Sequence, residues 1–189
     1  MNRVVLFVAA LALLGGGESA ALAKVDKADD NGFVVSFDID IAASPDALWA
    51  ALITPKKWWS GEHSWSGDAA NFWMKPVQGG CFCETLPKSK TRKSSGFVEH
   101  ARVIYADPAS TLRLSGVLGP LQSEALTGTM TYTIKPGASG AKTSKLKMEY
   151  VVGGYSRIPL KSVAPLVDKV LGEQMARLKA AAEAGVGKR

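Results

Sequence analysis

Apolar and polar residues alternate along much of the chain, which predicts β-strands with one buried face and one solvated face. In the clearest runs, apolar residues alternate with Thr or with charged residues. Glycine-, proline-, serine- and lysine-rich turns separate these runs. Seven strands are predicted at 33–41, 72–75, 80–86, 97–105, 111–115, 125–135 and 144–152. A single buried face per strand is typical of an antiparallel sheet.

Two short helices and one long helix are also predicted. Ser44 can cap a helix in which Pro45 takes the first position, so roughly two helical turns should follow. The Thr-Pro pair at 54–55 repeats this pattern and starts a second short helix. Apolar residues recur at helical spacing over 162–184, and this long helix should hold Pro165 in its first turn.

The order of these elements predicts an α+β domain over residues 32–185. Seven antiparallel strands with one solvated face need a cover, and the C-terminal helix is the only predicted element long enough to provide it. We therefore expect a helix-grip fold, with a curved sheet wrapped around the long helix. The two short helices would close one end of a cavity between sheet and helix. Residues 24–31 should form a flexible lead-in and residues 186–189 a disordered tail.

Residues 1–23 have the features of a signal peptide. Arg3 precedes an apolar run at 4–14, which is too short to span a bilayer, and residues 21–23 form a small-x-small cleavage site. We expect cleavage after Ala23 and a periplasmic or secreted protein. An uncleaved anchor or an N-terminal helix is the alternative interpretation.

The formal net charge is +6, and a basic cluster lies between two predicted strands. An exported protein of this charge is not expected to meet nucleic acid, but it can favour anionic surfaces. The cluster has two interpretations: a solvated hairpin tip, or a patch for peripheral contact with an anionic membrane. Its basic residues are Lys88, Lys90, Arg92 and Lys93.

Four segments of the chain, in order, match the pattern of a known family. They are residues 41–60 (IAASPDALWAALITPKKWWS), 79–84 (GGCFCE), 105–116 (YADPASTLRLSG) and 167–180 (VDKVLGEQMARLKA). Together they resemble the START-like superfamily, also called SRPBCC, in the branch of polyketide cyclase/dehydrase-like proteins and the activator of the heat-shock-protein-90 ATPase. The resemblance spans about residues 32–184 and implies the helix-grip fold and a cavity. Members bind lipids, sterols, polyketides or other hydrophobic ligands, and some catalyse cyclisation or dehydration.

We expect the cavity to bind a hydrophobic or amphipathic small molecule, lipid- or polyketide-like, without a cofactor. The expected lining combines part of a tryptophan cluster, an apolar loop after residue 115 and inward-facing strand residues. The remaining tryptophans are expected to be ordinary core. The predicted lining residues are Trp49, Trp58, Trp73, Phe82, Glu84, Leu118, Leu121, Tyr132 and Tyr150.

Glu84 is the candidate catalytic residue. A carboxylate in an apolar cavity could act as the acid or base of a cyclase or dehydratase. Alternatively, Glu84 is a polar anchor that is hydrogen-bonded to a neighbouring strand or a tryptophan. A third hypothesis is a partner-binding module of the cell envelope.

Cys81 and Cys83 are the only cysteines of the chain. If Phe82 and Glu84 face inward, both cysteines face the outer side of the sheet. Residues two apart on an extended strand have Cα atoms about 6.6 Å apart, at the limit of disulfide geometry, so a disulfide and free thiols both remain open. The paired ligand spacing of zinc motifs is missing, and we expect no metal site.

Overall fold

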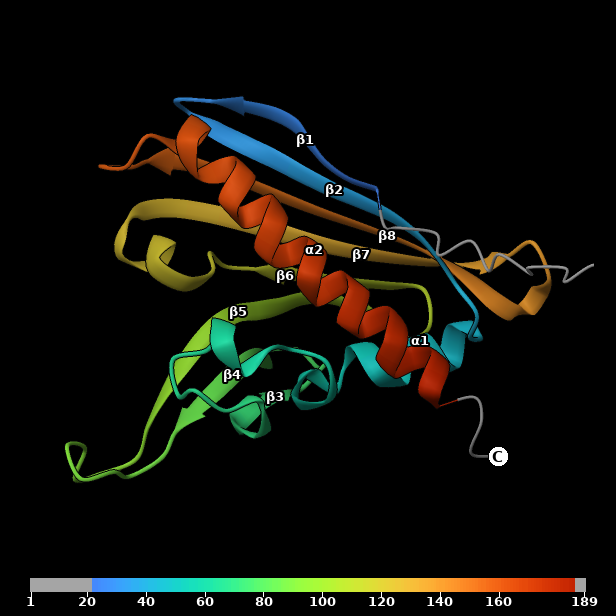
Figure 1. The fold of residues 1–189 in the computed structure, drawn as a ribbon, viewed down its shortest axis with the longest axis horizontal. Coiled ribbons are helices and arrows are strands. Elements are labelled where there is room, and N and C mark those ends of the chain that lie inside the picture. The colour runs from blue at the N-terminus through green and yellow to red at the C-terminus, as the bar shows by residue number, and fades with distance from the viewer. Residues whose placement is uncertain (1–21, 186–189) are drawn as a thin grey trace, which may run out of the picture.

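An eight-stranded antiparallel sheet carries one long helix across one of its faces (Figure 1). The structure is a computed structural model and describes residues 22–185, with side chains from residue 25 onward. Almost all of the predicted signal peptide, and the predicted C-terminal tail, lie outside the described residues. The strand order across the sheet is β1-β2-β8-β7-β6-β5-β4-β3.

The elements follow the predicted order along the chain. The strands are β1 (Leu22–Asp29), β2 (Gly32–Ile41), β3 (Phe72–Met74), β4 (Cys81–Leu86), β5 (Gly96–Asp107), β6 (Thr111–Ser115), β7 (Ala125–Gly137) and β8 (Gly140–Tyr155). The helices are α1 (Pro45–Leu52), the short 3-10 helices η1 (Pro55–Lys57), η2 (Gly61–His63), η3 (Ala69–Asn71) and η4 (Gly119–Ser123), and the long α2 (Leu160–Ala184). The predicted α+β helix-grip architecture is confirmed.

The first strand, β1, is an element that the sequence analysis did not predict. Residues 24–31 were expected to be a flexible lead-in, yet most of them pair with β2 and raise the strand count from seven to eight. Charged residues interrupt the apolar pattern here, as is common on edge strands, so the alternation was too weak to identify. The Asp26 carboxylate accepts a hydrogen bond from the Ser36 hydroxyl of β2, and Val25 packs against the core.

The alternating strand faces build the core as predicted. On β2, the five apolar side chains that alternate from Phe33 to Ile41 are buried, whereas Val34 on the opposite face is half-buried. They adjoin the inward residues of β8, where Met148 and Tyr150 pair with Phe37 and Val35. Burying this face removes apolar surface from water, which is the main force that holds the sheet against the helix.

Two proline signals end one helix and start another. Pro45 occupies the first turn of α1, and the Ser44 hydroxyl accepts a hydrogen bond from the Ala47 N–H at 3.3 Å. The Thr-Pro pair at 54–55 starts only a single 3-10 turn, because the chain extends again soon after η1. The second short helix is therefore shorter than predicted.

The long helix α2 begins two residues before its predicted start. Pro165 consequently lies inside the helix rather than in its first turn, which corrects the prediction. Pro159 takes the position before the helix. Pro165 is exposed, so its missing N–H costs one helical hydrogen bond without disturbing the core.

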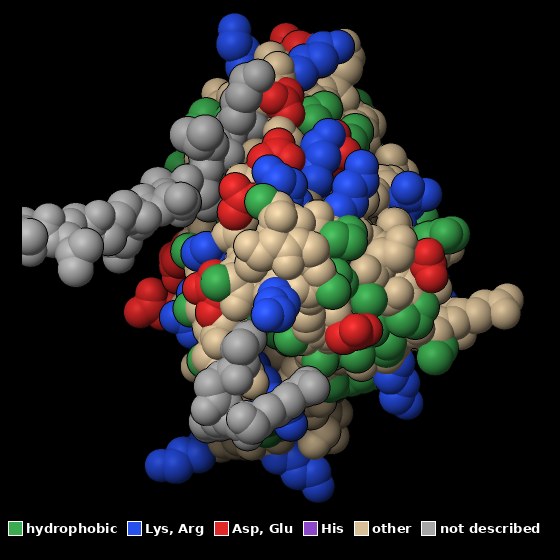
Figure 2. All heavy atoms as spheres, turned by 90° about the vertical axis from the view of Figure 1, so that its right-hand side faces the viewer, with side chains coloured by type: hydrophobic (Ala, Val, Ile, Leu, Met, Phe, Trp, Pro, Cys, Tyr) green, Lys and Arg blue, Asp and Glu red, His purple; other side chains and the backbone are tan. Residues whose placement is uncertain are grey.

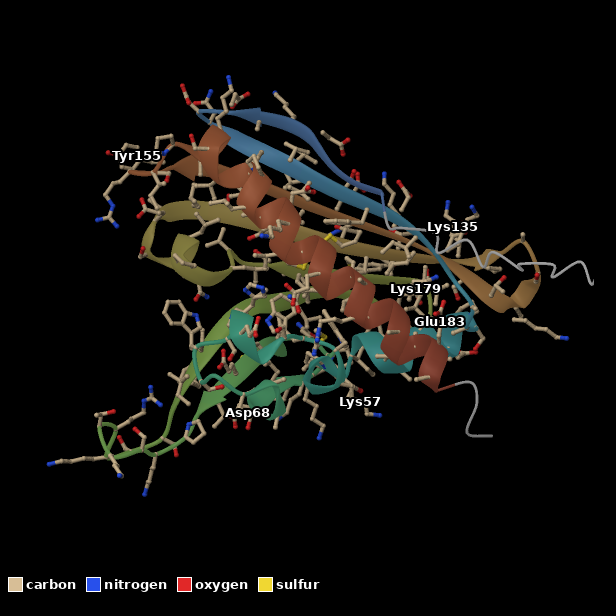
Figure 3. All side chains as sticks on the ribbon, in the orientation of Figure 1. Lys57, Asp68, Lys135, Tyr155, Lys179 and Glu183 are labelled. Carbon is tan, nitrogen blue, oxygen red and sulfur yellow. A yellow bond between two sulfur atoms is a disulfide. The ribbon has the colours of Figure 1, made fainter. Side chains whose placement is uncertain are left out.

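The last turns of α2 are fastened to the end of β2. The Glu183 carboxylate accepts a hydrogen bond from the Ala42 N–H at 2.8 Å, and the Lys179 ammonium donates to the Asp40 carbonyl. Lys179 and Glu183 also form an ion pair at 3.0 Å along the helix (Figure 3). These contacts fix the C-terminal end of the helix against the sheet.

Charged side chains cover much of the outer surface. Figure 2 shows basic and acidic side chains interspersed on the side that carries the end of α2. Among the described residues, no helix is long and apolar enough to cross a membrane.

The inner stripe of α2 should contribute most of the helix's share of stability. Leu171→Ala removes a side chain that is 1 % exposed, and we expect a loss of about 2–5 kcal/mol in the free energy of unfolding. Leu166→Ala on the same helix removes a side chain that is 65 % exposed and should change it by less than about 0.5 kcal/mol. Urea denaturation measures both, and equal losses would contradict the packing described.

Candidate functional site

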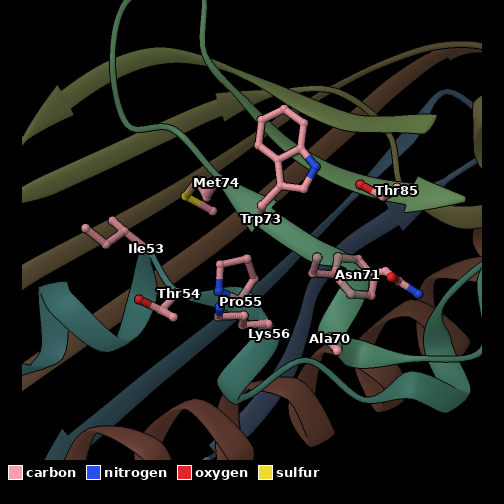
Figure 4. A pocket seen from close by; sticks show the side chains of 10 residues that line it. Ile53, Thr54, Pro55, Lys56, Ala70, Asn71, Trp73, Met74 and Thr85 are labelled. Carbon is pink, nitrogen blue, oxygen red and sulfur yellow. The ribbon is translucent and has the colours of Figure 1, made fainter. Parts of the chain in front are cut away.

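An open pocket lies at the β3 edge of the sheet, between the short helices and the strand (Figure 4). Its volume is about 380 Å³, which is within the range of small-molecule sites. The lining combines apolar side chains with a few polar ones and one cation. The residues are Ile53, Thr54, Pro55, Lys56, Ala70, Asn71, Phe72, Trp73, Met74 and Thr85. We call this the β3-edge pocket.

The local sequence explains how the pocket forms. Thr54 and Pro55 stop α1, so the chain turns there. The residues of this turn, 53–56, form one wall of the pocket. The alternation of β3 then sends Phe72 into the core while Trp73 stays 37 % exposed. The Lys75 ammonium lies 5.7 Å from the centre of the Trp73 ring, which is a cation–π contact.

The chemistry of the pocket suits an amphipathic molecule. Trp73 and Met74 offer apolar surface, while Thr54 and Asn71 offer hydrogen-bonding groups. Lys56 is exposed at the pocket and supplies a positive charge. A flat apolar body with an anionic group therefore fits these side chains.

Glu84 anchors the loop that carries one wall of the pocket. Its side chain is 0 % exposed, and both carboxylate oxygens accept hydrogen bonds. The Trp65 N–H donates at 3.1 Å to one oxygen and the Ser66 N–H donates to the other. His100 Nε2 lies 3.0 Å from the first oxygen and completes the set. A buried carboxylate needs such partners, because leaving it unpaired is costly.

His100 lies within a layer of aromatic rings. Its imidazole stacks on Phe72 with ring centres 5.2 Å apart, and Phe82 lies 5.1 Å away on a tilted plane. Burial lowers the pKa of His100 below its ordinary value, and the hydrogen bond and charge of Glu84 oppose this only in part. His100 therefore acts as a neutral donor to Glu84 near pH 7.

The other side of the same loop is fastened to α2. Buried Gln174 accepts a hydrogen bond from the Ser60 N–H at 2.8 Å through its side-chain oxygen. The Arg177 guanidinium donates to the Trp58 carbonyl at 2.8 Å. Glu173 faces His63 at 3.1 Å. The loop from residue 58 to residue 71 is thus held between the helix and the sheet.

The structure separates the predicted cavity residues into two groups. Of the nine, only Trp73 lines the β3-edge pocket. Leu118 is half-buried, and the other seven are buried. Those seven are Trp49, Trp58, Phe82, Glu84, Leu121, Tyr132 and Tyr150. Large side chains therefore occupy the space between sheet and helix in which the ligand was expected.

Two buried tyrosines belong to this interior. The Tyr150 hydroxyl accepts a hydrogen bond from the Leu118 N–H at 3.1 Å, which holds the segment before η4. The Tyr132 hydroxyl donates to the sulfur of Met130 at 2.9 Å. Burial raises the pKa of both phenols well above the ordinary value, so neither ionises at physiological pH.

Asp168 is a residue that the sequence analysis did not single out. It lies on α2 between the buried residues Ala164 and Leu171, and its Oδ1 atom is buried without a hydrogen-bond partner among the described residues. Burial raises the pKa of its carboxyl. In the sequence, Asp168 could have been identified as a charged residue on an otherwise apolar stripe of the long helix.

Cys81 and Cys83 form a disulfide, which decides between the two alternatives left open by the sequence. Their Cα atoms are 5.5 Å apart, closer than in a fully extended strand and within the common range for disulfides. Their pairing partners Arg102 and Glu99 are partly exposed, whereas Glu84 points inward. The two sulfurs therefore lie on the outer side of the sheet.

The basic cluster lies on the hairpin between β4 and β5. Lys88, Lys90 and Lys93 are exposed, and Arg92 donates a hydrogen bond to the Pro87 carbonyl at 3.0 Å. The side chains project into solvent, as both interpretations of this cluster require. Membrane contact through it stays a prediction.

Comparison with known proteins identifies the fold alone. No protein-family model matches the chain, and no functionally curated protein is significantly similar to it. Several solved structures share the fold at low sequence identity. The protein MLL2253 from Mesorhizobium loti has a TM-score of 0.53 at 19% identity, covering 78% of this chain and 95% of its own. A protein of unknown function from Staphylococcus aureus, SA2116, has a TM-score of 0.52 at 11% identity, covering 83% and 98%.

A further similar structure comes from another bacterium. EF2215 from Enterococcus faecalis, a conserved protein of unknown function, has a TM-score of 0.52 at 11% identity, covering 86% of this chain and 77% of its own. These neighbours place the chain among α+β proteins with a curved antiparallel sheet and a C-terminal helix.

Glu84→Gln should destabilise the protein. The amide keeps the shape of the side chain but turns one acceptor into a donor that faces other donors, and we expect a loss of about 1–3 kcal/mol in unfolding free energy. Glu149→Gln is the matched control, because its strand carboxylate is 39 % exposed and pairs with Lys147 at 3.0 Å. Urea denaturation distinguishes them, and an unaffected Glu84→Gln would contradict the anchor.

His100 should make stability depend on pH. Its folded pKa is lower than the unfolded value of about 6.5, so the unfolded state binds more protons below that pH. Stability that is present above pH 6.5 is therefore lost as the pH falls below 6.5 and through the lower pKa of the folded state. His100→Gln should flatten this part of the curve. Identical slopes for wild type and His100→Gln would contradict the assignment.

Proposed function

We propose that the protein is an exported START-like (SRPBCC) protein that binds a small amphipathic molecule, with the β3-edge pocket as the site. The pocket carries the proposal, since it combines a ligand-sized volume, an exposed tryptophan and a single cation. The ligand would place an apolar or aromatic body against Trp73 and Met74 and an acidic group toward Lys56.

The similarity in fold supports this class of function without naming a ligand. Helix-grip folds carry different functions, so the site has to supply the argument. The disulfide of the chain is compatible with the proposed periplasmic or extracellular location, because disulfides persist in oxidising compartments.

The alternative position for the same function is under α2. The unpartnered oxygen of Asp168 favours it, because a buried polar atom without a partner can mark the place of a bound polar group. The half-buried Val167, its neighbour in the sequence, offers apolar surface. Ligand entry there would require α2 or the η4 segment to move, because the interior side chains are packed.

An enzymatic role for Glu84 is less well supported. Both of its oxygens accept hydrogen bonds from the protein, so substrate would have to displace a backbone donor or His100. Among residues 25–185, no specific surface favours a partner-binding role in the cell envelope.

Binding of the amphipathic fluorescent probe anilinonaphthalene sulfonate tests the proposed site. Trp73→Ala should weaken binding about tenfold, since it removes the aromatic wall. Lys56→Gln should weaken it severalfold and reduce its salt dependence. Trp65→Ala is the matched control, because Trp65 is exposed outside the pocket, and it should change affinity less than twofold.

Asp168→Asn separates the two sites. Binding that is lost in Asp168→Asn and kept in Trp73→Ala would move the ligand beneath α2. Binding that survives both substitutions in proteins of unchanged stability would overturn both sites.

A further inference from the structure

The Cys81–Cys83 disulfide lies beside the carboxylate of Glu99, and the sequence alone does not predict this proximity. The two cysteines are separated by one residue, and both are largely buried. The sulfur atoms and a carboxylate oxygen of Glu99 all lie within 4.8 Å of one another. Cys81, Cys83 and Glu99 are called the Cys-Cys-Glu cluster below.

A β-bulge brings Glu99 into this position. Phe82 pairs with Ala101, whereas the next residue, Cys83, pairs with Glu99, so His100 is the extra residue in β5. The bulge lets His100 point inward to Glu84 while Glu99 stays on the outer side with the sulfurs. The same β-bulge thus places His100 beside Glu84 on the inner face and Glu99 beside the two sulfurs on the outer face.

Two thiolates and one carboxylate are a ligand set that Zn²⁺ accepts. Zinc binds cysteine sulfur at about 2.3 Å and carboxylate oxygen at about 2.0–2.2 Å, and sites with three protein ligands keep a fourth position for water. The Glu99 side chain is 36 % exposed, so the carboxylate borders solvent above the buried sulfurs. An ion bound here would therefore have a route in from solvent.

We propose that the Cys-Cys-Glu cluster is a redox-controlled binding site for a borderline divalent cation of the Zn²⁺ class. A small dithiol reduces the disulfide: the Cys81–Cys83 bond breaks, two cysteine thiols form, and the dithiol becomes a cyclic disulfide. Binding of the cation then releases the two thiol protons to solvent. In the oxidised state the sulfurs are bonded to each other and the site is closed.

Arg102, which lies beside Glu99, allows a test in which two substitutions should change metal affinity in opposite directions. Its guanidinium donates to both Glu99 oxygens, at 2.8 and 3.0 Å, so it competes with a metal ion for the carboxylate. Removing Arg102 should tighten metal binding, whereas removing the Glu99 charge should weaken it. Substitutions with only a structural effect would move both in the same direction.

Cobalt is the spectroscopic probe. The full-length protein is reduced with dithiothreitol, freed of it under argon and titrated with Co²⁺, and thiolate-to-cobalt charge-transfer absorption is recorded. We expect one equivalent of Co²⁺ to bind with this absorption, and Zn²⁺ to displace it. The unreduced protein should show none.

Four variants at the cluster and one control variant complete the experiment. Cys81→Ser and Cys83→Ser should each abolish the wild-type spectrum, Glu99→Gln should weaken binding at least tenfold, and Arg102→Gln should strengthen it. Glu149→Gln, on a distant strand pair, should match wild type. Reduced wild type without thiolate-to-cobalt absorption at excess Co²⁺, or Glu99→Gln and Arg102→Gln shifting affinity in the same direction, would overturn the proposal.

Discussion

The buried carboxylate of Glu84 is the interaction on which the rest of the site depends. It lies at the inner face of β4 and accepts hydrogen bonds from two backbone N–H groups of a loop and from the imidazole of His100. Those donors would otherwise need water, which the interior excludes. Because the loop is irregular, this carboxylate replaces the hydrogen bonds that a regular helix or strand would supply.

The α2 helix completes the support of the loop. Gln174 and Arg177 bond the backbone of residues 58 and 60, so the loop is tied to the helix at its start and to the sheet at its middle. The segment that follows then forms η3 and β3, which line the β3-edge pocket. The shape of the pocket therefore depends on the buried polar side chains of Glu84 and Gln174, which do not line it.

The sequence predicted much of the fold. The seven strands over 33–152 and the long helix are confirmed, because each carries a strong apolar period and clear turn residues. The edge strand β1 was missed because it has few apolar residues. Pro165 was predicted in the first turn of the long helix, but the helix begins earlier, at Leu160, after Pro159 and without a polar capping residue.

The site was harder to predict than the fold. The alternation of apolar and polar residues predicts only the face of the sheet to which a side chain points. Whether the space between sheet and helix is a cavity or a packed core depends on the sizes of the side chains that fill it. The inward direction of Glu84 could be read from the sequence, but its donors come from a loop whose path the sequence does not specify. The proximity of Glu99 to the cysteines depends on a bulge at His100, and the sequence carries no signal for that register shift.

In the function that we propose, the ligand binds in the β3-edge pocket, outside the packed space between the sheet and α2. The most direct measurement is the response of the five tryptophan indole N–H resonances while anilinonaphthalene sulfonate is added to ¹⁵N-labelled protein. We expect the Trp73 resonance to shift with saturation while those of buried Trp58 and Trp59 stay in place. Shifts of Trp58 and Trp59 with an unmoved Trp73 would contradict it.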